Sequence, residues 1–100
     1  MQILDYNLVL TCPCCPEQYD VFDSEGKQVG YLRLRHGGFR ADYPSCGGLE
    51  VYYTSFSDGW KGMFDNEEER EQYLTEAVKA LHNHERRLNL AVFKIQLEKE

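Results

Sequence analysis

Apolar and polar residues alternate along the chain from Gln18 to Phe56, and short clusters of Gly, Asp and Ser interrupt the alternation. A period of two is typical of strands that bury one face, and Gly-containing interruptions are typical of tight turns. The alternation therefore predicts an antiparallel meander, in which each strand pairs with the next one along the chain.

The interruptions divide this region into candidate strands, at residues 19–23, 28–35, 39–43 and 49–56. These runs predict a sheet of three to four strands, and an apolar run at residues 3–10 is a candidate opening strand. Side chains alternate between the two faces of a strand. We therefore expect Leu32 and Leu34 on one face, and Tyr31, Arg33 and Arg35 on the other.

A helical period begins after Asp65, which is suited to the N-cap position. Glu68 follows three residues later and completes a capping-box pattern, and the acids of the first turn complement the helix dipole. The first apolar residues of this segment share one stripe: Leu74, Ala77, Val78 and Leu81. The segment is therefore expected to cover one face of the sheet.

The apolar stripe keeps its phase beyond residue 84, because Leu88, Val92 and Ile95 fall on it. A continuous helix over about residues 66–97 has a length of about 50 Å. A domain of this size has a radius of gyration near ~13 Å, so the end of the helix is expected to project. The alternative is a break at residues 82–84 followed by a strand over residues 90–97, which is rich in Val, Phe and Ile. We favour the helix.

These elements predict an α+β fold, a three- to four-stranded antiparallel β-meander with a long C-terminal α-helix packed on one face. One hundred residues suit one domain. We therefore expect a single domain over residues 1–100, mainly β over residues 1–64 and mainly helical over residues 65–98.

Composition narrows the classes of partner. The chain has 42% hydrophobic residues, and its 17 acidic residues outnumber its 11 Lys and Arg residues to give a formal net charge of -6. This acidity disfavours undirected binding to nucleic acid or anionic lipid. The first residues lack the pattern of a secretion signal, and no run approaches the ~20 apolar residues of a membrane span. We expect a cytoplasmic protein with no membrane partner.

Cysteine spacing offers one candidate metal site. Cys12-Pro13-Cys14-Cys15 contains the spacing of a zinc knuckle. Cys46, together with His36 or one of the histidines of the predicted helix, could complete a tetrahedral set with Cys12 and Cys15. The same tetrapeptide resembles a glutaredoxin-type redox motif, although the helix that would lower a thiol pKa does not follow it. A single knuckle is a weak signal, so we favour ordinary reduced thiols in a cytosol and expect no cofactor.

Basic and aromatic residues interleave around one predicted hairpin. Arg33, Arg35 and Arg40 could neutralise phosphates beside aromatic rings that stack bases. Asp42 and Glu50 are expected on neighbouring strands, where pairs of opposite charge would make a self-neutralised face. A nucleic-acid-binding module is therefore the alternative, not the favoured function.

Residues 16–82 resemble a group of small bacterial proteins associated with prophages or other mobile elements. The stretches that carry the resemblance are QYDVFDSEGKQVGYLRLRHGGFRADYP and DGWKGMFDNEEEREQYL. The resemblance implies a bacterial, intracellular setting. No activity is attached to the group, so it implies no functional residues.

The function expected from the sequence is non-enzymatic binding. Leu90, Phe93 and Leu97 lie on the opposite side of the projecting helix end from the stripe that faces the sheet. An apolar helix end without a sheet beneath it needs a partner. We therefore expect protein–protein association, in the form of a homo-oligomer such as a dimer, with another protein as the other option. The second alternative is a zinc or thiol-redox protein that uses Cys12, Cys15 and Cys46.

Overall fold

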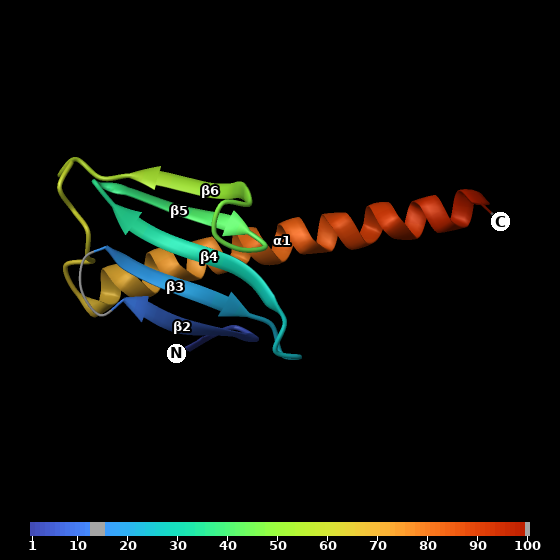
Figure 1. The fold of residues 1–100 in the computed structure, drawn as a ribbon, viewed down its shortest axis with the longest axis horizontal. Helices are drawn as coiled ribbons and strands as arrows, with labels where there is room; N and C mark the ends of the chain where they lie inside the picture. Colours follow the sequence, from blue (N-terminus) through green and yellow to red (C-terminus); the bar gives the residue numbers. More distant parts are fainter. Residues whose placement is uncertain (13–15, 100) are drawn as a thin grey trace.

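The computed structural model describes the backbone at residues 1–12 and 16–99, and the side chains of these residues as far as residue 96. A single antiparallel sheet forms one layer, and one long helix forms the other (Figure 1). The α+β class and the long C-terminal helix predicted from the sequence are confirmed.

The described part of the chain contains six strands and one helix. They are β1 (Gln2–Ile3), β2 (Tyr6–Cys12), β3 (Glu17–Phe22), β4 (Gln28–Arg35), β5 (Gly38–Tyr43), β6 (Leu49–Ser55) and α1 (Glu67–Lys99). The strands pair in chain order, each antiparallel to the next. The predicted meander is therefore correct.

The predicted strand count of three to four is too low. The four strands expected between residues 19 and 56 are present as β3 to β6, and the apolar run at residues 3–10 adds two more strands. That run folds back on itself, because Ile3 pairs with Tyr6 across a turn in which Leu4 has φ of 54°. A non-glycine residue rarely adopts positive φ, so the sequence gives no signal for this turn.

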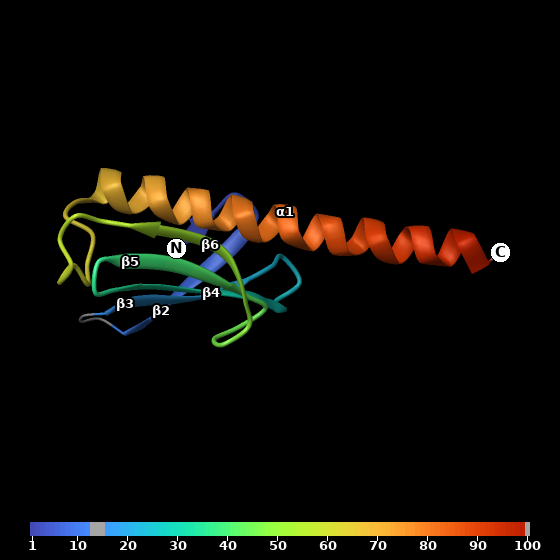
Figure 2. The ribbon, with the colours of Figure 1, turned by 90° about the horizontal axis from the view of Figure 1, so that it is seen from above.

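Figure 2 shows α1 lying along one face of the sheet, and the core side chains fill the space between these two layers. Leu32 and Leu34 of β4 are fully buried, as the alternation predicts, and they pair with Ala41 and Phe39 of β5. The helix contributes the four side chains expected from its stripe, all at most 1% exposed: Leu74, Ala77, Val78 and Leu81. Burial of these apolar side chains is the main force that holds the two layers together.

Gly30 allows the helix to approach the middle of the sheet closely. A Cβ atom built at this position would lie 2.4 Å from Cδ1 of Leu81. Glycine in a strand often marks such an approach of another element. The contact fixes where α1 crosses the sheet.

The N-cap of α1 is Asn66, and the predicted cap at Asp65 is one residue too early. The Asn66 side-chain oxygen accepts a hydrogen bond from the backbone N–H of Glu69 at 2.8 Å, and the Glu69 carboxylate accepts one from the N–H of Asp65 at 3.1 Å. Asp65 instead pairs with the ammonium of Lys61 at 2.7 Å. Aspartate and asparagine cap equally well, so the sequence alone did not separate the two positions.

The C-terminal half of α1 extends beyond the sheet. In Figures 1 and 2 the orange-to-red part of the helix has no strand beside it, and the molecule measures 53 Å along its longest axis against 25 and 22 Å across. The helix is continuous through residues 82–84, so the alternative of a break and a strand at residues 90–97 is wrong. Among the described residues, no helix has the length and apolar character needed to cross a bilayer.

Candidate functional site

The part of α1 that extends beyond the sheet, residues 86–99, is called here the projecting end. Every side chain from residue 86 to residue 96 is exposed. Five of them are large and apolar, with exposed fractions between 42% and 59%: Leu88, Leu90, Val92, Phe93 and Ile95. A contiguous exposed apolar set of this kind is a candidate interaction surface.

The apolar residues of the projecting end form two stripes. Leu88, Val92 and Ile95 continue the stripe that faces the sheet, but no described strand lies beneath them. Leu90 and Phe93 lie on the other side of the helix, 54% and 59% exposed. Leu97, which the sequence placed with Leu90 and Phe93, lies in α1, and its side chain is outside the described part.

The neighbours of the first stripe are uncharged between residues 88 and 96, and Glu85 and Lys99 lie at its two ends. At helical spacing, Asn89, Gln96 and Ala91 flank Leu88, Val92 and Ile95, whereas the cations Arg87 and Lys94 lie away from that stripe. Two copies of the stripe packed antiparallel would therefore bring no like charges together along the seam. This self-complementarity is what a twofold contact requires.

The sheet face that points away from α1 carries basic and aromatic side chains. Arg33 lies directly opposite Arg40, and Arg40 lies directly opposite Tyr53, so the three come from neighbouring strands. With Arg35, His36 and Gly38 they line a shallow hollow of about 360 Å³. The structure thus brings together all three arginines that the sequence singled out.

The sequence predicted that acidic side chains would neutralise this face, and among its three arginines only Arg40 has such partners in the described part of the chain. Arg40 donates to the Asp42 carboxylate at 2.7 and 2.9 Å, and Glu50 lies 3.7 Å away. The hydrogen bond to Asp42 raises the pKa of the Arg40 guanidinium despite its partial desolvation. Arg33 and Arg35 have no acidic partner within 4 Å among the side chains that the structure describes.

Trp60 is an exposed aromatic residue that the sequence reasoning did not assign to a site. It is 86% exposed, and its ring meets the His36 ring edge-to-face with centroids 6.4 Å apart. Trp60 lies in the connection between β6 and α1. A hydrogen bond from the Gly37 N–H to the Lys61 carbonyl, at 2.9 Å, links this connection to the β4–β5 turn. The available signal was a tryptophan placed between two glycines, where a core is not expected.

The candidate zinc ligands are distributed over both ends of the sheet. Cys12 ends β2, and His36 follows β4 at the same end, whereas Cys46 lies in the β5–β6 connection at the other end. Cys15 lies outside the described residues. Within the described part of the chain, Cys12 and Cys46 are free thiols and no three His, Cys, Asp or Glu residues are arranged to hold a metal ion.

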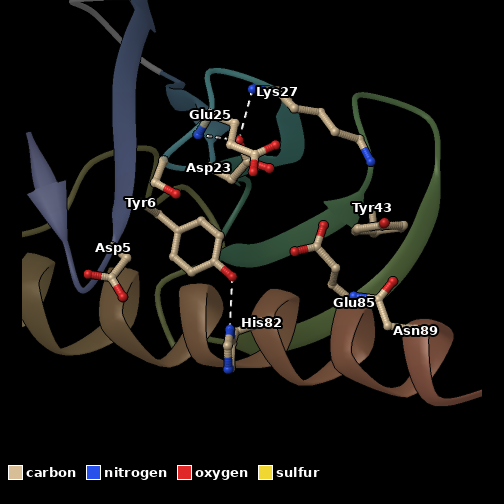
Figure 3. Close-up of a pocket in the computed structure, with 10 residues that line it drawn as sticks. Asp5, Tyr6, Asp23, Glu25, Lys27, Tyr43, His82, Glu85 and Asn89 are labelled. Carbon is tan, nitrogen blue, oxygen red and sulfur yellow. Dashed lines mark hydrogen bonds between the residues drawn. The ribbon is translucent and has the colours of Figure 1, made fainter.

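A polar hollow of about 380 Å³ lies between the middle of α1 and two turns, the β1–β2 turn and the β3–β4 turn. Figure 3 shows the side chains that line it. The Tyr6 hydroxyl and His82 Nδ1 share a hydrogen bond of 2.9 Å across it. Burial, followed by the nearby charges of Glu85 and Asp23, raises the pKa of Tyr6, so this phenol keeps its proton and ties β2 to the helix. The Asp23 carboxylate accepts hydrogen bonds from the backbone N–H groups of Glu25 and Lys27, each at 2.9 Å. These bonds stabilise the β3–β4 turn.

A buried ion pair connects the start of α1 to the sheet. Glu17 is 4% exposed and accepts hydrogen bonds from Arg70 Nε at 2.8 Å, from the Tyr19 hydroxyl at 2.6 Å and from the Phe64 N–H at 3.3 Å. Burial favours a higher pKa of Glu17, but these hydrogen bonds outweigh it and hold the pKa below its usual value. This group anchors the helix to the sheet, and its three side chains line one wall of a hollow of about 260 Å³.

Comparisons with protein-family models, with curated proteins and with solved structures return no match to this chain. The resemblance of residues 16–82 to small prophage-associated bacterial proteins stays a prediction.

Proposed function

We propose that this protein is a non-enzymatic binding protein that self-associates through the projecting end of α1. The observation that carries the proposal is the row of five large apolar side chains, each at least 42% exposed, on a helix segment beyond the sheet. Exposed apolar area is stabilised when a partner covers it.

A second copy of the chain suits the projecting end as its partner. Antiparallel packing places Leu88 of one copy near Ile95 of the other, with Val92 close to the twofold axis. Asn89 and Gln96 then flank the seam without opposing like charges. The basic side chains Arg87 and Lys94 face away from this contact.

The second stripe extends the same association. Once Leu88, Val92 and Ile95 are covered by one copy, Leu90 and Phe93 lie on the outer side of the pair. Leu97 shares their side of the helix by its spacing in the sequence. Packing of this stripe against another pair would cover the remaining apolar surface, as in a bundle of helices. Both stripes are therefore contact surfaces in the proposal, with dimers as the basic unit.

Sedimentation velocity from low to high micromolar concentration tests the proposal. The wild type is expected to form dimers or larger species. Val92→Asp should lower the mass at a given concentration by weakening the dimer, and Phe93→Asp should lower it by removing species larger than the dimer. In each variant a carboxylate replaces an apolar side chain worth about 2 kcal/mol on burial. That loss is more than tenfold in the dissociation constant.

Val9→Asp is the matched control for these variants. Val9 is 44% exposed on β2, far from the projecting end, so the same substitution there should leave the mass unchanged. A wild type that stays monomeric at high concentration, or an assembly that survives both helix substitutions, contradicts the proposal.

A further inference from the structure

The open face of the sheet carries a second surface that self-association does not use. We call it the basic-aromatic surface and define it by Arg33, Arg35, His36, Arg40, Tyr53 and Trp60. From it we infer that the protein also binds single-stranded nucleic acid, with phosphates at the arginines and bases stacked on the aromatic rings.

The guanidinium of Arg33 has no acidic partner in the described part of this surface, although it lies opposite a second arginine. Arg33 and Arg40 stand directly opposite each other on β4 and β5, and like charges in that position destabilise a sheet. Arg40 pairs with Asp42 at 2.7 Å and with Glu50 at 3.7 Å. Neither carboxylate pairs with Arg33, so an anion bound between the two guanidiniums would relieve the repulsion.

The nearby acids Asp20 and Asp58 form no ion pair with Arg33 or Arg35 within 4 Å in the part of the chain that the structure describes. The Asp20 carboxylate accepts a hydrogen bond from Gln28 at 3.2 Å, and that of Asp58 accepts the N–H of Trp60 at 2.9 Å. Arg33 and Arg35 therefore stay available in the described part of the structure. The positive charge of these two arginines can attract an anion only at short range, because the chain as a whole carries a net charge of -6.

Two aromatic rings beside the arginines are exposed and held in place. Tyr53 is 57% exposed and packs over Gly38, where an added Cβ would lie 2.9 Å from the Tyr53 hydroxyl oxygen. Trp60 is 86% exposed on a turn fixed by the hydrogen bonds from Gly37 N–H to Lys61 carbonyl and from Phe56 N–H to Gly37 carbonyl. Exposed rings carried on a fixed backbone offer faces on which bases can stack.

The backbone is strained at His36, which belongs to the basic-aromatic surface. His36 has φ of 52° and Gly37 has φ of 74°, so the two form a tight turn with positive φ at both positions. Asparagine and aspartate are the residues usually found before glycine in such a turn. A strained, exposed histidine next to Arg35 and Trp60 is more costly for the fold than these alternatives, which is consistent with a binding role.

Single-stranded nucleic acid fits this combination better than an acidic peptide. An acidic peptide would satisfy Arg33 and Arg35 but would leave Tyr53 and Trp60 without stacking partners. A single strand supplies an anionic backbone and unpaired bases together. Because the whole protein is acidic, we expect modest affinity that falls steeply as salt rises.

Fluorescence anisotropy of a labelled oligothymidylate of about ten nucleotides, titrated with the full-length protein at low salt, tests the inference. Arg33→Ala and Trp60→Ala should each weaken binding about tenfold, through a lost phosphate contact and a lost stacking platform respectively. Lys79→Ala is the matched control. Lys79 is an exposed cation on α1, on the other side of the sheet, so its removal should leave the affinity almost unchanged.

Three outcomes would overturn the inference. They are no binding at low salt, equal weakening by Lys79→Ala and Arg33→Ala, and binding of oligoglutamate as tightly as the oligonucleotide, which would mark an unspecific anion surface. The Phe93→Asp variant separates this inference from self-association. It should keep the wild-type affinity for the oligonucleotide while losing mass in sedimentation.

Discussion

At the residue scale, Glu17 is the side chain on which the joint between helix and sheet depends most. The carboxylate is buried, and it receives two hydrogen bonds from Arg70, at 2.8 and 3.2 Å. Burial of Tyr19 and its hydrogen bond to Glu17 raise the pKa of that phenol. The Glu17 bond raises the pKa of Arg70 as well, so all three groups keep the charge states that the pairing needs.

Glu17→Gln should lower the free energy of unfolding by about 3 kcal/mol at neutral pH, because it leaves Arg70 without its buried partner. The pKa of Glu17 is lowered in the folded state, so its stabilisation is complete above the unfolded pKa of about 4.3 and is lost as pH falls through the folded pKa. The difference between wild type and variant should therefore shrink in acid.

Urea unfolding followed by far-UV circular dichroism from neutral pH to acid measures this difference. Circular dichroism is the better probe, because the Trp60 ring is 86% exposed in the folded protein. Glu25→Gln is the control, since Glu25 is exposed in the β3–β4 loop and should show almost no effect. Equal stability of wild type and Glu17→Gln at neutral pH would refute the assigned role.

The burial of Glu17 could have been predicted in part from the sequence, but its pairing with Arg70 could not. Glu17 shares the period of Tyr19 and Val21 on the apolar face of β3, so an acid stood where a buried residue was expected. Its partner Arg70 lies 53 positions away, and no local pattern connects the two. Pairings between distant residues depend on how the layers dock, which the alternation does not specify.

At the element scale, α1 consists of two parts with different surroundings. Up to Leu81 its apolar stripe is buried against the sheet, and from residue 86 onward every described side chain is exposed. The sequence predicted both the helix and its excess length, because the apolar phase continues through residues 82–84. It could not place the turn at Leu4 or the cap at Asn66, since each depends on backbone geometry that several residue types tolerate.

A chain that ends at Arg87 should fold as stably as the Val92→Asp variant, in which the dimer seam is disrupted, because the removed side chains through residue 96 are at least 42% exposed where large and apolar. Thermal unfolding by circular dichroism, at matched concentration, checks this. The helical signal should fall while the midpoint stays within a few degrees. A midpoint more than about 10 °C lower would show that the projecting end stabilises its own domain.

At the scale of the whole molecule, self-association and nucleic-acid binding are proposed for two separate surfaces. The projecting end is apolar and lies along the long axis, whereas the basic-aromatic surface lies on the sheet face away from α1. Arg33, Arg35 and Arg40 were singled out from sequence, but Trp60 was not, because its place beside His36 depends on how the turn before α1 packs. The two surfaces can therefore be tested separately.

The central claim is that projecting ends of different copies contact each other. An isotope-filtered NOE experiment on a mixture of labelled and unlabelled protein tests it most directly, since it detects only contacts between copies. The account predicts cross-peaks between copies among the methyl groups of Leu88, Val92 and Ile95 and from the Phe93 ring. An associated sample whose cross-peaks come only from the sheet, or a sample with none at high concentration, would contradict it.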